Sequence, residues 1–308
     1  MIFGGMEMMN ESIKKEEMMF EKNSTKDKLN NLFNVKWILV ILPALFIIVF
    51  TFVPMISLFK LSIIDENGFT FKYIAQIFTE PIYLQVIWLT LKTSFIVTAI
   101  SIVLAYPVAY FIIKTKSSRT KKVILMIIMI PFWISLLVRT FSWIIILQEQ
   151  GILNTFLKNI GLISQPLDLL YNTTSVTIGM THVLFPYMVL NVYSVMSSID
   201  IQLVEVAQVM GARPIKAFWQ VFFPLSVPGI LSGSILVFVL ALGYFITPAL
   251  LGGSKNMLVS TLIQNNISAT LNWPLASALS LVLFIITMVL LSILAVLATR
   301  NPMLKEGE

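Results

Sequence analysis

Six long runs of apolar residues divide the chain, and polar segments of varied length separate them. The runs fall near residues 37–59, 90–113, 123–147, 175–197, 226–250 and 276–298. Each reaches the roughly 20 residues that an α-helix needs to cross the hydrocarbon core of a bilayer. The pattern therefore predicts an all-α membrane protein with six transmembrane helices.

The polar segment at residues 198–224 has a helical pattern of its own. Asp200 suits the N-terminus of a helix, and Gly211 is expected to end it. Apolar residues recur on one helical face at Ile199, Leu203, Val206 and Met210. The segment thus predicts a short amphipathic helix between two membrane spans.

A second short helix is expected to follow within the same segment. Pro214 suits its first position, and Pro224 is expected to stop it. Its apolar residues form a predicted stripe at Ile215, Phe218, Trp219 and Phe222. Two amphipathic helices that meet at a glycine indicate a loop to which a partner protein binds.

The polar ends and loops determine the expected orientation. Most of the 21 lysines and arginines lie in four places: residues 1–36, 114–122, 198–224 and 299–308. Because basic residues favour the cytoplasmic side of a membrane, both termini and the 198–224 loop are predicted to be cytoplasmic. The first run, at 37–59, is predicted to be a retained helix and not a cleaved signal.

The remaining loops are predicted to lie outside the cell. Residues 60–87 form one external loop, and residues 88–298 form a domain of five further helices. Short surface helices are expected in the 60–89 and 148–174 segments, the latter around residues 153–162. Neither segment is long enough for a separate domain.

Composition supports a membrane protein and narrows its chemistry. The 308 residues are 57% hydrophobic and 12% charged, whereas soluble domains average about 25% charged residues. No cysteine is present, and one histidine, His182, cannot form a metal site alone. The net charge of +6 follows from the cytoplasmic loops, so no nucleic-acid partner is expected.

The sequence contains no recognisable catalytic constellation, and an enzyme is not expected. There is no G-x-x-x-x-G-K-[ST] phosphate-binding loop, and all 15 acidic residues lie outside the six apolar cores. Because intramembrane carboxylates usually mark ion-coupled transport, their absence disfavours an ion-coupled transporter or channel acting alone. That alternative stays open, but energy for uphill transport is expected to come from another chain.

Arg139 is the one charge well inside an apolar run. Counted from Lys122 at about 1.5 Å per residue, it lies toward the outer side of the membrane. One interpretation is that its side chain extends outward to the interface. The other is that it lines or locks the outer end of a solute pathway.

Two spans carry helix-breaking residues beside polar groups. Gly243–Pro248 is expected to interrupt the fifth span, which makes Tyr244 and Thr247 candidates for a solute pathway. Pro186 predicts a kink in the fourth span, where Tyr187 and Asn191 share one helical face. A small-residue face that includes Gly229 and Gly233 is expected to pack closely on another helix.

The 198–224 segment resembles the cytoplasmic loop of the transmembrane subunits of bacterial ATP-binding-cassette (ABC) importers. That loop reads E-A-A, three residues, G, nine residues, I-x-L-P. At the family spacing this chain has Glu205, Val206, Ala207, Gly211, Val221, Phe223 and Pro224. Val206, Val221 and Phe223 are apolar replacements, and Arg213 stands where a small capping residue is common.

Further stretches resemble permeases of spermidine/putrescine importers. They are Glu80–Leu84, Tyr106–Tyr110, Pro131–Trp133, Leu137–Trp143, Gly151–Asn154, Thr247–Gly253 and Asn272–Pro274. The resemblance covers about residues 37–300. Permeases for other small solutes, such as iron, thiamine, phosphonates or opines, share many of these stretches.

The resemblance implies a type I ABC importer transmembrane domain in the bacterial cytoplasmic membrane. It implies a homologous second permease, two copies of an ATPase that binds ATP and magnesium, an extracytoplasmic solute-binding protein and a small-molecule substrate. No cofactor is expected in this chain, and its remaining contacts are with lipid. The loop would couple to the ATPase through Glu205, Ala207, Gly211, Arg213 and Pro224.

Overall fold

A computed structural model describes residues 37, 39–65, 68–253 and 256–300. The predicted tail at residues 1–36 and most of the one at 299–308 lie outside these ranges. Within them, six helical segments are long and apolar enough to cross a membrane, which confirms the predicted fold class. The chain divides into two units, residues 1–60 and 61–308, and the span Leu39–Ile63 provides the helix of the first unit.

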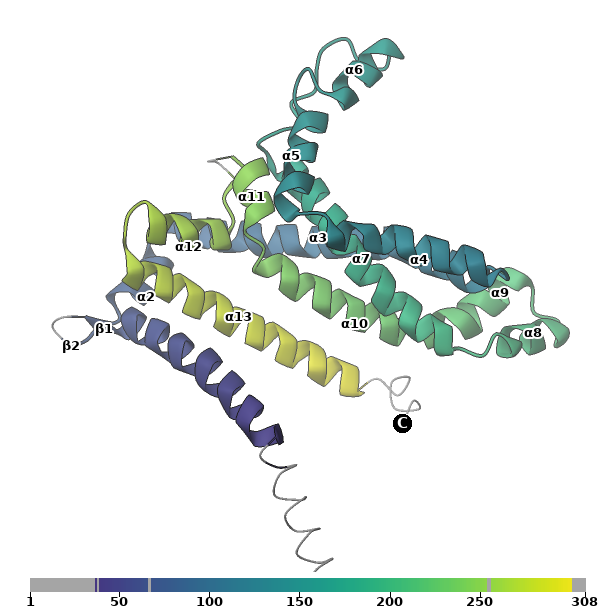
Figure 1. Cartoon of the computed structure of the whole chain (residues 1–308), viewed down its shortest axis with the longest axis horizontal. Helices are drawn as coiled ribbons and strands as arrows, with labels where there is room; N and C mark the ends of the chain where they lie inside the picture. Colours follow the sequence, from purple (N-terminus) through teal and green to yellow (C-terminus); the bar gives the residue numbers. More distant parts are fainter. Residues whose placement is uncertain (1–36, 38, 66–67, 254–255, 301–308) are drawn as a thin grey trace, which may run out of the picture. The chain divides into compact units, whose positions relative to one another are not determined.

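The second unit holds the other helices and a short hairpin (Figure 1). In order these are β1 Ile64–Asp65, β2 Gly68–Phe69, α2 Lys72–Thr79, α3 Pro81–Lys114, α4 Ser118–Trp133, α5 Leu136–Leu147, α6 Ile152–Asn159, α7 Thr173–Ser198, α8 Gln202–Val209, α9 Pro214–Ala217, the π-helix η1 Phe218–Phe222, α10 Phe223–Leu242, α11 Ile246–Leu251, α12 Val259–Ser268 and α13 Trp273–Arg300. The predicted surface helices are α2 and α6. The hairpin was not predicted, because strands of two residues are too short to show a periodic pattern.

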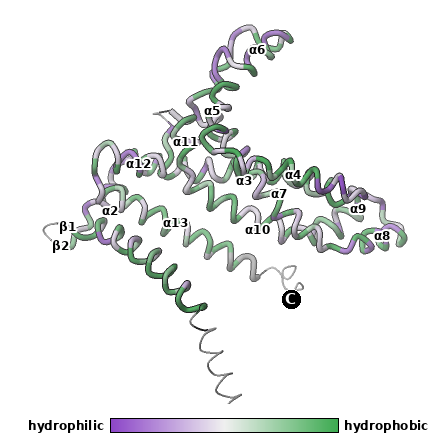
Figure 2. The backbone as a smooth tube through the Cα atoms, in the orientation of Figure 1, coloured by the Kyte–Doolittle hydropathy of each residue, from purple (hydrophilic) through white to green (hydrophobic). Residues whose placement is uncertain are grey.

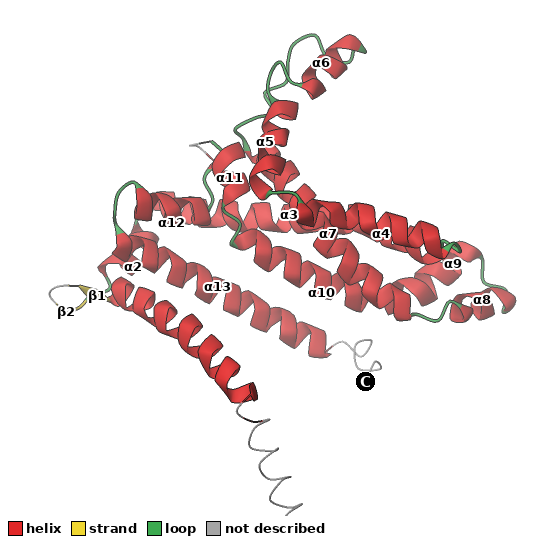
Figure 3. Cartoon of the chain, in the orientation of Figure 1, coloured by secondary structure: helices red, strands yellow, loops and turns green. Residues whose placement is uncertain are grey.

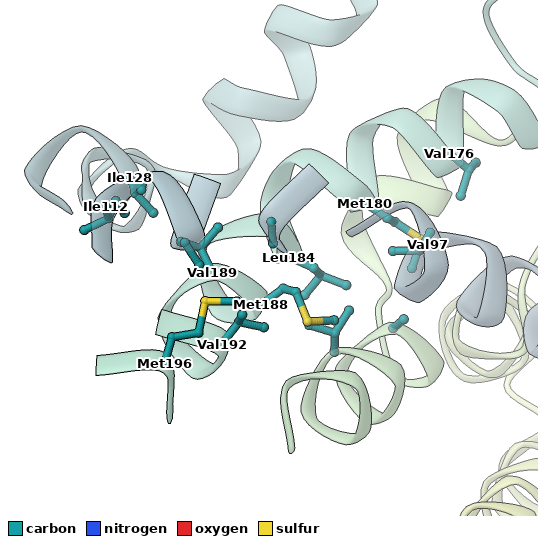
Figure 4. Packing of buried hydrophobic residues seen from close by; sticks show 14 of the residues in the cluster. Val97, Ile112, Ile128, Val176, Met180, Leu184, Met188, Val189, Val192 and Met196 are labelled. Carbon is teal, nitrogen blue, oxygen red and sulfur yellow. The ribbon is translucent and has the colours of Figure 1, made fainter. Parts of the chain in front are cut away.

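Helix α7 forms the centre of the second unit, with α3 and α10 packed against it (Figure 1). Its most apolar window is 61% buried, the largest share among the six spans described. Met180 of α7 lies beside Val97 of α3, and both side chains are fully buried (Figure 4). Tight packing of this kind makes the central helices move together.

The small-residue face of α10 packs against α7, as predicted. A β-carbon added at Gly229 would lie 2.8 Å from Cβ of Val195, and one added at Gly233 would lie 2.8 Å from Sδ of Met188. Both separations are shorter than normal van der Waals contact. The two glycines therefore allow the helices to approach closely.

A second apolar cluster joins α2, α3, α12 and α13. Ile77, Val259 and Leu279 are buried there, and the Val259 N–H donates a 2.9 Å hydrogen bond to Oγ1 of Thr90. Figure 2 shows hydrophobic colour along much of α10 and α13, and more hydrophilic colour on α12. This arrangement attaches the last span to the beginning of α3.

The third predicted span, 123–147, is wrong as a single helix and in its bounds. Residues 123–147 are divided between α4 and α5, which separate at Ile134 and Ser135 (Figure 3). The segment of this region that is long and apolar enough to cross a membrane is Leu136–Asn159. Ile134 has extended backbone, with φ −88° and ψ 132°. Pro131 has no N–H to donate, so it weakens the hydrogen bonding of the preceding helical turn.

Pro224 does not stop the second loop helix, so that prediction is also wrong. The chain continues from α9 through η1 into α10, and the Phe223 N–H donates to the Phe218 carbonyl, five residues earlier. A π-helix widens the turn. The widened turn makes room for the proline ring, which would clash in a regular α-helix.

The predicted interruption of the fifth span is confirmed, although the span ends earlier than expected. It ends at Leu242 and not at 250, and Gly243–Phe245 separate it from α11. Helix α7 contains Pro186 and continues through it without a break, so the kink expected there stays a prediction.

Candidate functional site

The 198–224 loop forms one candidate site. Its first helix ends as predicted, but its N-cap is Ile201, one residue after the predicted Asp200, and the Ile201 side chain makes no capping hydrogen bond. The Gln202 N–H donates a 2.9 Å hydrogen bond to Oδ1 of Asp200. At the other end Gly211 has φ +93°, and the Ala212 N–H donates to the Ala207 carbonyl at 3.0 Å. A β-carbon at Gly211 would contact nothing within 4 Å, so the backbone conformation and not space requires glycine.

An exposed apolar surface, called here the loop face, covers this end of the molecule. It consists of Leu203, Val206, Val209, Met210, Ile215 and Trp219. Val209 is 89% exposed and Met210 is 84% exposed, although both are large apolar side chains next to a hydrophilic loop. Large exposed apolar side chains gathered on one polar loop make this surface a candidate for contact with another molecule.

The predicted stripe on the second loop helix is divided between two faces. Ile215 and Trp219 are exposed, whereas Phe222 is 1% exposed and Phe218 is half-buried against the core. The π-helix changes the angular step between successive residues. Four residues that would lie on one face of a regular α-helix therefore point to two different faces in this segment.

The remaining loop residues are accessible or half-buried. Glu205 lies exposed in the first turn of α8, where the helix dipole favours a negative charge. Ala207 and Pro224 are half-buried, and Arg213 is exposed. Arg213 precedes α9 without a side-chain capping bond, as its side chain predicts.

Aromatic side chains connect the loop to α3. The Tyr110 ring lies 5.1 Å from the rings of both Phe218 and Phe222, in edge-to-face geometry. The Tyr106 and Ser226 hydroxyls lie 2.9 Å apart in a hydrogen bond. Each such ring pair contributes about 0.5–1.5 kcal/mol beyond its buried area, so the loop is firmly attached to α3 and α10.

The second candidate site gathers polar side chains from α5, α7 and the α10–α11 connection. The Tyr244 phenol lies within electrostatic range of Arg139 of α5 and of Tyr187 of α7, and close to the Thr247 hydroxyl. The Thr247 and Thr140 hydroxyls lie 3.4 Å apart. Helices α5 and α11 lie side by side (Figure 1), and we call this group the Arg139 cluster.

Asn191 does not belong to the Arg139 cluster. Its Nδ2 donates a 2.9 Å hydrogen bond to the Tyr187 carbonyl, and its Cβ lies against Gly233 of α10. The amide therefore supports the backbone of α7 within the α7–α10 contact. The structure thus brings together four of the five predicted pathway residues.

Three neighbours of the cluster were not predicted as site residues. The Trp143 Nε1–H donates to Nδ1 of His182 at 3.2 Å, and this orients the imidazole. A β-carbon at Gly179 would lie 2.7 Å from Thr247 and 2.6 Å from Leu251. Gly179 therefore lets α11 lie directly on α7, and no periodic pattern marks a single glycine of this kind.

The described residues contain no group of three or more His, Cys, Asp or Glu side chains that could hold a metal ion. The polar groups of the Arg139 cluster are hydroxyls, one imidazole and one guanidinium. They can bind, orient or repel a passing solute. They do not form a nucleophile–base pair.

Solved transporter structures share this architecture. A bacterial alginate ABC transporter, in complex with an alginate pentasaccharide-bound periplasmic protein, matches with a TM-score of 0.70 at 19% identity, over 84% of this chain and 92% of that chain. The MetNI methionine ABC transporter matches with a TM-score of 0.54 at 16% identity, over 70% and 93% respectively. The fold is that of a type I ABC importer transmembrane domain.

Sequence relatives give a narrower match. The spermidine/putrescine transport system permease protein PotB of Haemophilus influenzae is 33% identical over 251 residues, 80% of this chain and 87% of that protein. PotB of Escherichia coli is 31% identical over 248 residues, 78% and 89% respectively. Residues 101–301 match the family described as binding-protein-dependent transport system inner membrane component, and the chain belongs to that family.

Proposed function

We propose that this chain is the transmembrane permease subunit of an ATP-driven importer whose cargo is a polyamine of the spermidine/putrescine class. A separate ATPase docks on the 198–224 loop from the cytoplasm. The observation that carries the proposal is the loop face, an exposed apolar surface on a membrane protein's polar loop. The remaining steps follow from what that surface contacts.

The loop face fits the mode in which a short amphipathic helix lies in a hydrophobic groove of a partner. Burial of apolar surface stabilises such a contact by about 25 cal/mol per Å². The basic residues Lys216 and Arg213 beside it, together with Lys121 and Lys122 at the start of α4, support a cytoplasmic position.

Movement of the docked helix passes into the membrane through the aromatic contacts. Helix α8 contacts α9 and η1, and η1 contacts Tyr106 and Tyr110 of α3. When the ATPase pair closes on ATP and magnesium, α8 is displaced and carries α3 and α10 with it. Packed elements transmit such a shift as a rigid-body rotation, which changes the side of the membrane to which the pathway opens.

The proposed assembly has four kinds of chain. This permease pairs with a homologous second permease, the ATPase pair binds below them, and a solute-binding protein delivers cargo from outside. The chain supplies no catalytic group and no cofactor of its own. Hydrolysis belongs to the ATPase, because the sequence contains no phosphate-binding loop.

The names of the PotB relatives support a polyamine cargo. A polyamine is a flexible cation, yet helices α3, α4, α5, α7, α10, α11 and α13 contain no Asp or Glu. Recognition of its charge therefore rests on the solute-binding protein and the second permease. Tyr187 and Tyr244 can offer aromatic faces to the ammonium groups.

Reconstitution of the complete assembly in vesicles tests the proposal. Labelled spermidine is expected to accumulate only with ATP, with the ATPase and with the binding protein. Ferric chelates, thiamine and a phosphonate serve as competing cargo, and the preferred solute identifies the class. Accumulation by this chain alone, without the ATPase, would refute the proposed function.

A further inference from the structure

Arg139 lacks a counterion in the part of the chain that the structure describes. Its Nε is buried and has no hydrogen-bond partner among those residues. Seven apolar helices of the second unit contain no Asp or Glu: α3, α4, α5, α7, α10, α11 and α13. The acidic residue nearest to Arg139 in the sequence, Glu149, lies beyond the end of α5. The guanidinium therefore meets no carboxylate from the apolar helices that the structure describes.

The polar neighbours of Arg139 do not compensate its charge. His182 and Tyr244 are the groups with which it interacts electrostatically. The His182 Nδ1 accepts from Trp143, and the Thr140 hydroxyl donates to the Leu136 carbonyl at 2.9 Å. Hydroxyls and a neutral imidazole can solvate a cation, but they do not neutralise it.

Leaving this charge without a partner is costly. An Arg at the centre of a membrane helix costs about 2.5–3.5 kcal/mol even where it can reach water or headgroups. Those groups lie outside the protein, whereas the Nε of Arg139 is buried and its electrostatic neighbours lie on α7 and beside α11. Arg139 as a whole is half-buried, so part of its side chain remains accessible to a group from another chain.

We infer that a carboxylate of the second permease pairs with Arg139 at the level of the α10–α11 interruption. The inference rests on the proposed function, because it takes the partner and the cationic cargo from it. Cargo cannot supply the countercharge, since an ammonium group repels a guanidinium. The second permease is the chain that shares the membrane spans, and a planar guanidinium is suited to a bidentate carboxylate contact.

The pair has a direct consequence for a cationic cargo. While the carboxylate is bound to Arg139, the local charge is neutral. When the two permeases separate, Arg139 is a free positive charge and the carboxylate is a free negative one on the opposite wall. The cargo is then attracted to the partner's wall and repelled from this one, which assigns the selective contacts to the second permease.

Charge reversal in the complete assembly tests the pair. Arg139→Glu is expected to lower ATP-driven uptake of labelled spermidine about 100-fold, the size typical of an uncompensated buried charge. Changing one Asp or Glu in the spans of the second permease to Arg is expected to restore at least about one tenth of the lost uptake. Lys92→Glu, a matched charge reversal at an exposed position of α3, is expected to have little effect.

A chemical variant keeps the test informative if Arg139→Glu does not assemble. The chain contains no cysteine, so Arg139→Cys introduces a single thiol. A positively charged methanethiosulfonate reagent is expected to restore uptake, and a negatively charged one is expected not to. Equal effects of the two reagents would overturn the charge pair.

The remaining outcomes separate the pair from its alternatives. Full uptake by Arg139→Gln, or the failure of every acidic position in the partner's spans to restore Arg139→Glu, would refute the inference. Loss of uptake from wild-type protein in vesicles without anionic lipid, with recovery on adding phosphatidylglycerol, would instead assign Arg139 to lipid. Wild-type assembly and uptake report on the proposed function independently of all these variants.

Discussion

The loop end and the Arg139 cluster show opposite departures from the usual distribution of polar and apolar side chains. At the loop end, large apolar side chains such as Val209 and Met210 lie exposed beside polar sequence. In the Arg139 cluster, a charged side chain lies partly buried among apolar helices. Each region places side chains against their usual preference for water or for the interior, and each is therefore the basis of a proposed contact with another subunit.

The two regions also differ in how they are built. The loop end depends on backbone: a left-handed glycine, a π-helix and a rigid aromatic contact. The Arg139 cluster depends on side chains that meet from three separate helices. Substitutions at the loop end should therefore alter coupling, and those near the cluster should alter stability or selectivity.

The largest effect is expected from Gly211→Asp. A side chain at φ +93° costs about 1–2 kcal/mol, and the added carboxylate lies next to the apolar loop face. ATP-driven uptake should fall to background while the protein still enters the membrane. Gly68→Asp is the matched control, because Gly68 also has positive φ and open space around it.

Uptake and membrane insertion are measured together for both glycine variants. Normal uptake by Gly211→Asp would separate the loop from coupling. A similar loss in Gly68→Asp would show that the effect is general strain and is not specific to the loop.

A smaller effect is expected from Val209→Glu. The charge enters the loop face and is expected to weaken docking of the proposed ATPase by about tenfold, or ~1.4 kcal/mol. Co-purification of the ATPase in detergent and ATP-driven uptake measure it. Gln208→Glu adds the same charge away from the loop face by helical position, and unchanged binding by both variants would exclude this surface.

Gly179→Ala tests the α7–α11 contact beside the Arg139 cluster. The added β-carbon would clash with Thr247 and Leu251, and overpacking of this kind costs about 1–3 kcal/mol. The melting temperature in detergent should fall, with ATPase binding unchanged. Gly243→Ala is the control, since no atom lies within 4 Å of its added β-carbon; equal melting temperatures for the two variants would contradict the packing.

The smallest effect is expected from Tyr106→Phe. The ring contacts with Phe218 and Phe223 remain, and only the 2.9 Å hydrogen bond to Ser226 is lost. The expected cost is about 1 kcal/mol, measured by thermal unfolding. Tyr106→Ala also removes the ring, so a loss no larger than that of Tyr106→Phe would show that the aromatic contact contributes little.

The sequence predicted the loop end better than the Arg139 cluster, for a physical reason. Asp200, Gly211 and Pro214 act on their own neighbours in the chain, so local rules locate them. The prediction at Pro224 was wrong because a π-helix lets the chain continue in the same direction where an α-helix would end. The rule that proline stops a helix therefore does not hold in this segment, where the aromatic side chains pack against α3.

The cluster depends on contacts between distant segments, which periodicity cannot reveal. Arg139, Tyr187, Tyr244 and Thr247 were each selected singly, and the structure brings them together through the α11–α5 and α11–α7 contacts. Gly179 and His182 were missed as site residues, since their partners Thr247 and Trp143 lie far away in the chain. The single-helix prediction for residues 123–147 failed because hydropathy does not respond to a two-residue break.

Helix α3 is long enough to connect the loop end with the opposite end of the second unit. Its 34 residues extend about 50 Å at 1.5 Å per residue, which exceeds the ~30 Å hydrocarbon core. It holds the aromatic contact of the loop near one end and, through Thr90, the start of α12 near the other. A tilt of a few degrees at the loop therefore displaces the far end by several ångströms, so the length of α3 alone turns a small movement at the loop into a larger one at the opposite end.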